Sequence, residues 1–228
     1  MSTELGTQPS SIAMIRTLGG IAMLSGILIV LVYQITLPMI MENKRIALEA
    51  AVFKVIPNAV SKVSFVLTPD ELIRLDDMST GTIEGEKIYV GYDKNKQLAG
   101  IAMEAEAPGY QDTVQTLYGY SPTCECIIGM TVLQSKETPG LGDKVETDPK
   151  FLANFKALDA KLNVDKTALI HPITTVRHGK KTQAWQIDAI SGATVTSKAI
   201  GKGLNNSTQK LLPMLSKRLG ELPQIVAE

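Results

Sequence analysis

The sequence has no excess of charge of either sign, because 23 Lys and Arg residues balance 23 Asp and Glu residues. It contains no cluster of Lys and Arg and no aromatic stacking motif. Since basic patches supply most of the affinity of nucleic-acid-binding proteins, we expect no nucleic-acid partner. The motifs G-x-S-x-G and H-E-x-x-H, a P-loop and the Rossmann fingerprint are also absent. No residue of this chain is therefore predicted to be catalytic.

Cysteine and histidine are scarce, with Cys124 and Cys126 as the only cysteines. One C-x-C pair offers too few ligands for a zinc or iron–sulfur site, and it is not the C-x-x-C-H of haem attachment. A disulfide between residues this close in sequence would be strained. We interpret the pair as incidental residues of a hairpin turn, with a redox role at a protein interface as the alternative. His171 and His178 have no Cys, Asp or Glu nearby, so no metal site is predicted.

Charge is entirely missing from residues 18–41, a run of 24 residues. About 20 such residues span a bilayer core, so we predict a transmembrane helix over 18–41, preceded by a short cytoplasmic tail over 1–17. A cleaved signal peptide is disfavoured, because the run is long and no small-x-small site follows before Glu42. Basic residues lie mainly after the span, and the positive-inside rule alone would keep the rest of the chain in the cytoplasm.

The region after the span is predicted to be a helical connector over 42–82. Its first part prolongs the membrane helix and stops before Pro57, and a second helix is expected to start at Pro69. Two β-hairpins should follow, each with alternating apolar residues and a turn between its strands. Their strands are predicted at 87–92, 98–103, 114–120 and 127–133.

Helical spacing of apolar residues predicts a helix over 149–162. A long helix is expected after Thr194, interrupted by Pro213. We therefore place a domain at 83–212 and a C-terminal tail at 213–228. Hairpins mixed with helices, without regular βα alternation, predict an α+β fold with a mainly antiparallel sheet and flanking helices.

The segment Asp188-Ala-Ile-Ser-Gly-Ala-Thr194 stands where a strand is predicted to pass into a helix. Residues 181–188 alternate polar and apolar side chains, which indicates the strand. The helix is indicated by apolar residues at steps of four and seven, namely Ile200, Leu204, Leu211 and Leu215. The free N–H groups of a helix start, with Gly192 beside them, suit a phosphate group. The alternative is an ordinary helix cap, in which Ser and Thr are favoured.

A second motif, Glu137-Thr-Pro-Gly-Leu-Gly142, lies about fifty residues upstream. As a bare string it predicts only a turn, because Pro and Gly favour tight backbone angles. The two motifs in this order resemble those of the FMN-binding domains in Rnf complexes and in Na⁺-translocating NADH:quinone reductases. The resemblance extends over roughly 83–204, and the predicted membrane segment fits it.

In that family the threonine at the end of the first motif carries FMN through a phosphoester bond, which a flavin transferase forms with FAD as donor. The resemblance therefore implies covalent FMN on Thr194, with Thr196 and Ser197 as nearby alternatives. The loop 137–142 is expected to cradle the flavin ring. The residues expected to bind the cofactor are Ser191, Gly192, Ala193, Thr194, Val195, Thr196, Glu137, Thr138, Gly140, Leu141 and Gly142.

Within the family, the chain resembles the G subunits of Rnf complexes, which couple electron transfer between ferredoxin and NAD to sodium or proton translocation. This resemblance implies an electron relay without a substrate site of its own, with other subunits of the complex as partners. It also implies a single-pass protein of the inner membrane whose FMN-binding domain, 83–212, faces the periplasm. The alternatives are the C subunits of the Na⁺-translocating NADH:quinone reductases, or a non-redox, membrane-anchored assembly or binding subunit.

Overall fold

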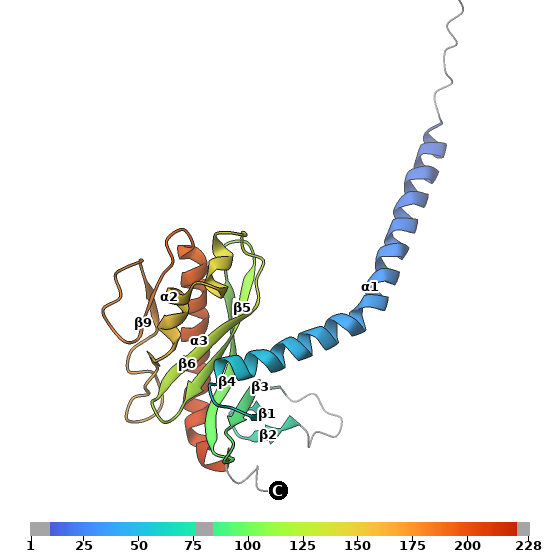
Figure 1. Cartoon of the computed structure of the whole chain (residues 1–228). Helices are drawn as coiled ribbons and strands as arrows, with labels where there is room; N and C mark the ends of the chain where they lie inside the picture. The colour runs from blue at the N-terminus through green and yellow to red at the C-terminus, as the bar shows by residue number, and fades with distance from the viewer. Residues whose placement is uncertain (1–9, 76–83, 223–228) are drawn as a thin grey trace, which may run out of the picture. The chain divides into compact units, whose positions relative to one another are not determined.

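A computed structural model describes residues 10–75 and 84–222 (Figure 1). The chain divides at Ile46 into an N-terminal helical unit and a domain that begins at Ala47. Helix α1 (Ser11–Val55) contributes residues to both units. The predicted α+β class, with an N-terminal helix followed by an antiparallel sheet domain, is confirmed.

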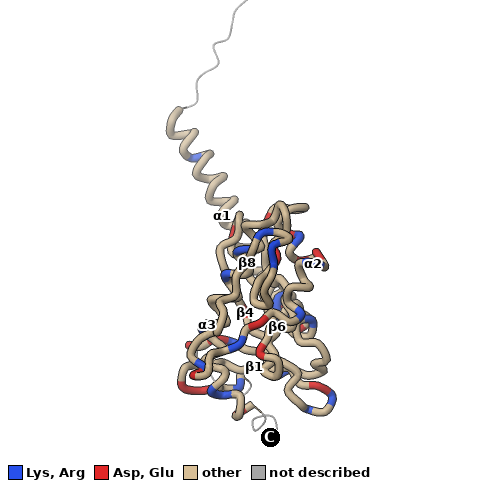
Figure 2. Tube along the Cα trace, turned by 90° about the vertical axis from the view of Figure 1, so that its left-hand side faces the viewer, with Lys and Arg blue, Asp and Glu red and all other residues tan. Residues whose placement is uncertain are grey.

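The N-terminal unit contains the part of α1 that is long and apolar enough to cross a membrane, in agreement with the predicted span at 18–41. In Figure 2 the upper part of α1 is almost entirely tan, the colour of uncharged residues. The tail predicted over 1–17 is helical from Ser11 onward, because α1 already begins there. Ser10 explains this start, since its side-chain oxygen accepts a hydrogen bond from the Ala13 N–H at 3.3 Å. Residues 1–9 lie outside the described residues.

Seven strands form one antiparallel sheet in the order β2-β1-β3-β4-β5-β6-β7. Both predicted hairpins are confirmed, as β3 (Glu86–Tyr92) with β4 (Leu98–Pro108) and β5 (Thr113–Ser121) with β6 (Cys126–Gln134). Strand β4 continues past the predicted end at 103, because its last residues pair with β5 as far as Pro108 opposite Thr113. This extension leads the chain into the turn that later forms part of the candidate site.

The predicted helical connector over 42–82 is wrong beyond Val55, where α1 ends. Strands β1 (Ser61–Leu67) and β2 (Leu72–Arg74) follow and belong to the same sheet. The helix start expected at Pro69 is a turn, in which the Thr68 N–H donates to the Glu71 carbonyl at 2.9 Å. Phe65 and Leu67 alternate with period two and are fully buried, which is a strand pattern. Residues 76–82 of this prediction lie outside the described part of the chain.

The predicted helix over 149–162 is also wrong in length. Helix α2 (Pro149–Leu152) and one 3₁₀ turn (Ala153–Phe155) are followed by strand β7 (Leu158–Asp159), which pairs with β6. Asn154, inside the 3₁₀ turn, links α2 to β9, because its side-chain amide donates to the carbonyl oxygens of Phe151 at 2.9 Å and Asp188 at 3.2 Å. The apparent helical spacing thus combined buried residues from a short helix and from a strand.

The expected strand at 181–188 is reduced to β9 (Gln186–Asp188), which pairs in parallel with β8 (Thr174–Val176). The preceding residues form a turn held by the Gln186 side chain, whose oxygen accepts the Thr182 N–H at 2.9 Å.

Helix α3 (Thr194–Arg218) starts at the predicted residue but continues through Pro213. The first part of the predicted tail over 213–228 is therefore helical, and residues 223–228 lie outside the described residues.

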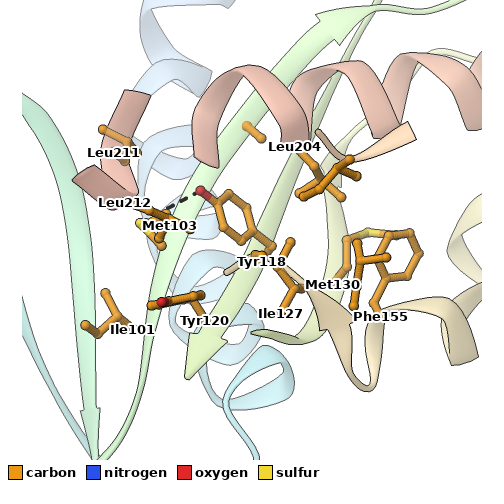
Figure 3. Close-up of a cluster of buried hydrophobic side chains, with 14 of the residues drawn as sticks. Ile101, Met103, Tyr118, Tyr120, Ile127, Met130, Phe155, Leu204, Leu211 and Leu212 are labelled. Atoms are coloured by element: carbon orange, nitrogen blue, oxygen red, sulfur yellow. Dashed lines mark hydrogen bonds between the residues drawn. The ribbon is translucent and has the colours of Figure 1, made fainter. Parts of the chain in front are cut away.

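The sheet is covered on both faces. Helix α3 packs on one face, where Tyr118, Met103 and Leu204 form part of the larger core (Figure 3). The end of α1, within the domain, covers the other face with Val52 and Val55. Gly119 and Gly129 pair across β5 and β6, and a Cβ atom at either position would collide with the Val55 carbonyl. The absence of side chains at this pair lets the helix end approach the sheet closely.

Cys124 and Cys126 form a disulfide at the tip of the β5–β6 hairpin, contrary to the interpretation of incidental turn residues. The left-handed backbone of Glu125 (φ 51°) turns the chain sharply enough to bring the two side chains together. In the chain-entropy model, a cross-link closing three residues stabilises the fold by only about 1.6 kcal/mol, about half the value for a 15-residue loop. The bond therefore contributes little stability to a hairpin already held by its strand ladder.

Candidate functional site

Two loops far apart in the sequence line one pocket of about 390 Å³. One is the 137–142 loop after β6, and the other is the 191–196 segment that enters α3. Tyr110, in the turn between β4 and β5, lines a third side. The lining residues are Tyr110, Glu137, Thr138, Leu141, Gly142, Gly192, Ala193, Thr194, Val195 and Thr196. Of the predicted binding residues, Ser191 and Gly140 do not line this pocket.

A second pocket of about 390 Å³ lies along α3, beside β4 and β5. Glu86, Glu104, Glu106 and Lys210 are among its lining residues, and Lys210 is paired with Glu86 at 2.5 Å. Neither sequence motif contributes to this pocket. The candidate site is therefore the pocket that the two motifs share.

The backbone before α3 is shaped by Gly192, whose φ of +87° is unfavourable for other residues. Ala193 is the residue that precedes the helix, and it provides no side-chain cap. Ser197 is fully buried and holds this turn, since its hydroxyl donates to the Ala193 carbonyl at 2.8 Å and accepts the Ile190 N–H at 3.2 Å. The alternative, in which the other Ser and Thr hydroxyls of the motif only cap the helix, is thus not supported by the geometry.

The three candidate hydroxyls differ sharply in their contacts. Ser197 is engaged in the turn, and Thr196 is buried with its hydroxyl donating to Glu137 Oε2 at 2.5 Å. The Thr194 side chain is half-buried, lines the pocket and makes no hydrogen bond with any of the described residues. Among these hydroxyls, only that of Thr194 faces the pocket without a competing partner.

Glu137 joins the three sides of the pocket through its buried carboxylate. Its Oε1 accepts the backbone N–H groups of Tyr110 at 2.8 Å and Gln111 at 3.1 Å, while Oε2 accepts the Thr196 hydroxyl. Burial alone raises the pKa of the Glu137 carboxyl. The hydrogen bonds from Thr196 and from the backbone together outweigh burial, so the net shift of the pKa is downward. The carboxylate is therefore held in its charged form.

Glycine is required where the loop passes this carboxylate. A Cβ atom on Gly142 would lie 2.7 Å from Glu137 Cβ, and one on Gly109 would lie 2.5 Å from Glu137 Oε1. The loop also closes on itself, because the Thr138 carbonyl accepts the N–H groups of Leu141 at 3.1 Å and Gly142 at 3.0 Å. These contacts explain the glycine at the end of the second motif.

Residues 109–209 match a family model described as the FMN-binding domain. This part of the chain is therefore similar to the FMN-binding domain family. The resemblance inferred from the two motifs is thereby confirmed. The match begins at the turn that contains Tyr110 and ends within α3, so it includes every residue that lines the candidate pocket.

Two curated relatives align with the FMN-binding domain and with most of the rest of the chain. The G subunit of the proton-translocating ferredoxin:NAD(+) oxidoreductase complex of Clostridium ljungdahlii is 26% identical, over 90% of this chain and 93% of the relative. The G subunit of an ion-translocating oxidoreductase complex of Shewanella piezotolerans is 29% identical, over 86% of this chain and 90% of the relative.

A solved structure shows the same fold. It is the C subunit of the Na(+)-translocating NADH-quinone reductase from Parabacteroides distasonis, with a TM-score of 0.58. The superposition covers 76% of this chain and 95% of that chain, at 19% sequence identity. The similarity supports the fold assignment of the FMN-binding domain and its flanking elements.

Tyr110 is a pocket residue that sequence reasoning missed. Its side chain is 71% exposed, and the pocket is also lined by the exposed apolar side chains of Leu141 and Val195. The FMN-binding domain thus presents one aromatic and two aliphatic side chains around an opening beside Thr194. An aromatic residue directly after Gly109, in the turn between two strands, was the available signal.

Asp188, the first residue of the motif, does not line the pocket. Its carboxylate accepts the Gly179 N–H at 2.7 Å, and its own N–H donates to Asn154 Oδ1 at 3.0 Å. The Lys181 ammonium also donates to Asn154 Oδ1 at 3.0 Å. These contacts fix the end of β9, from which the chain enters the Ser191–Thr194 turn. Asp188 therefore positions the segment Ser191–Thr194 rather than contacting the pocket.

We predict that Glu137→Gln destabilises the FMN-binding domain by about 1–2 kcal/mol near neutral pH, because a buried charge-assisted hydrogen bond is lost. The lowered pKa of Glu137 also means that its ionised form stabilises the fold above the ordinary value of 4.5. This stabilisation is lost as the pH falls through the pKa of the folded state, which lies below that of the unfolded chain. The stability of the variant should therefore decrease less in acid than that of the wild-type protein.

Urea unfolding at neutral pH and at several values below 4.5 measures both effects. The matched control is Glu146→Gln, which changes an exposed carboxyl on the following turn and should leave stability unaltered. An unchanged acid profile in Glu137→Gln would show that this carboxylate does not hold the loops together.

Proposed function

We propose that this chain is the FMN-carrying electron-relay component, equivalent to the G subunit, of an Rnf-type ion-translocating ferredoxin:NAD⁺ oxidoreductase complex. The two curated relatives that align over most of the chain are both named as G subunits of such oxidoreductase complexes. The FMN-binding domain family over 109–209 supports FMN as the cofactor. FMN supplies one- and two-electron chemistry, and this chain contributes its attachment, orientation and access. The other subunits of the complex are its partners.

We propose Thr194 as the attachment residue. The observation that carries this assignment is that its hydroxyl lines the pocket and has no hydrogen-bond partner among the described residues. The site lies at the first residue of α3, where the helix dipole and the free N–H groups of the first turn favour a phosphate. A flavin transferase would join the FMN portion of FAD to Thr194 Oγ1, with release of AMP.

The apolar opening of the pocket suits the flavin ring. Tyr110, Leu141 and Val195 are all exposed around it, and an aromatic side chain stacks favourably on a planar ring. Because Glu137 holds the Tyr110 turn and the motif helix together, these side chains are positioned before the cofactor arrives. A ring bound at the rim stays accessible to neighbouring electron carriers.

We further propose that the span at 18–41 anchors the chain in the inner membrane with the FMN-binding domain on the periplasmic side. The disulfide supports this orientation, since disulfides persist in oxidising compartments and are rare in the cytosol. The basic residues after the span argue weakly against it, because large domains cross membranes largely regardless of charge. A covalent bond also retains FMN where a dissociated cofactor would be lost.

We predict that Thr194→Ala, produced together with a flavin transferase, has no in-gel flavin fluorescence after denaturing electrophoresis. Thr196→Val and Ser197→Ala should retain fluorescence at a reduced level, because each loses a contact that holds the site but leaves the Thr194 hydroxyl in place. Thr194→Ser is the rescue control, because it restores a hydroxyl at the same position. Fluorescence in Thr194→Ala would move the attachment elsewhere. A wild-type protein without covalent flavin would refute the proposed function.

For the orientation, we predict that protease added to intact spheroplasts degrades the domain and leaves a short membrane fragment. An antibody against a tag on the N-terminus identifies that fragment, and a cytoplasmic protein of the same cells serves as the control for leakage. Complete protection of the domain until the cells are lysed would place it in the cytoplasm.

A further inference from the structure

The tip of the β5–β6 hairpin carries a disulfide that the proposed electron relay does not use. Strand β5 has nine residues, which corresponds to a length of about 30 Å. Its Thr113 end adjoins the Tyr110 turn at the FMN pocket, whereas its Ser121 end leads to Cys124 and Cys126. The disulfide is therefore at the opposite end of the sheet from the candidate flavin site.

The two sulfur atoms differ in accessibility. Cys124 is exposed, whereas Cys126 is 7% exposed and lies at the start of β6, paired with Asp159 of β7. A thiolate approaching from solvent can therefore reach Cys124 Sγ more easily than Cys126 Sγ. The arrangement favours one direction of attack, with Cys126 as the leaving group.

A purely structural role does not account for this bond. The hairpin is closed next to the tip by the pairing of Ser121 with Cys126, and the Glu125 carbonyl accepts the Ala160 N–H at 3.1 Å. A cross-link over a single intervening residue adds little constraint to the unfolded chain.

We propose that Cys124–Cys126 is a reversible thiol–disulfide exchange site for a protein dithiol. A thiolate of the dithiol attacks Cys124 Sγ, which forms a mixed disulfide and breaks the Cys124–Cys126 bond. Cys126 leaves as a thiolate and takes up a proton. The second thiolate of the dithiol then attacks its own partner sulfur and releases Cys124, which is protonated in turn. The hairpin gains two electrons and two protons, and the dithiol becomes a disulfide.

The first test uses the full-length protein in detergent, without denaturant, with dithiothreitol as the dithiol and N-ethylmaleimide as the trap. Intact mass should show no maleimide adduct before reduction, two adducts after it, and none again after reoxidation. A disulfide that opens only in denaturant would overturn the proposal. Two free thiols in protein isolated from an oxidising compartment would overturn it as well.

Single variants test which sulfur is attacked. Cys126→Ser leaves Cys124 alone, and it should react with a small aromatic disulfide probe at least about tenfold faster than Cys124→Ser, which leaves the buried thiol. Equal rates, or a faster reaction of Cys126, would contradict the assigned direction.

The double variant Cys124→Ser/Cys126→Ser tests the structural alternative. Its melting temperature should fall by no more than about 6 °C, because the cross-link closes so few residues and the strand ladder still holds the hairpin. A larger fall would identify the bond as a stabilising cross-link and overturn the proposal. None of these readouts involves FMN, so the exchange site and the electron-relay function can fail independently.

Discussion

The hydrogen bond from Thr196 to Glu137 is the contact on which the candidate site depends. It joins side chains 59 residues apart, and the same carboxylate accepts two backbone N–H groups from the Tyr110 turn. A hydrogen bond to a buried charged group contributes about 1.5–3 kcal/mol, and leaving such a group unpaired costs more. Three separate segments are thus held around one pocket, and the same bond occupies the hydroxyl of Thr196 and leaves that of Thr194 available.

The parts of the fold that could be predicted are those whose pattern is local. Strands β3 to β6 alternate or are continuously apolar between clear turns, and α3 begins directly after a glycine-containing turn. The failures have long-range causes. Residues 149–162 looked helical because Phe151 in α2, Phe155 in the following 3₁₀ turn and Leu158 in β7 are all buried. Pro213 did not end α3, because Leu212 and Leu215 bury the helix against the core on both sides of it.

In the candidate site, too, the local features could be predicted and the long-range contacts could not. The two motifs could be recognised as strings, and the family resemblance implied that both lie at one flavin. The hydrogen bond that joins them could not be predicted, since it is made by a carboxylate buried between them. Sequence alone left Thr196 and Ser197 as competitors of Thr194, and only burial and hydrogen bonding separate the three. Tyr110 reaches the pocket because β4 runs on to Pro108, an extension that depends on pairing with β5.

The central claim is that the hydroxyl left free in this pocket is the one that carries FMN. The most direct measurement is tandem mass spectrometry of the α3 peptide from wild-type protein, isolated from cells that also make a flavin transferase. The account predicts an FMN moiety on Thr194 and unmodified Thr196 and Ser197. FMN located on Thr196 or Ser197, or a peptide that is unmodified throughout, would contradict it.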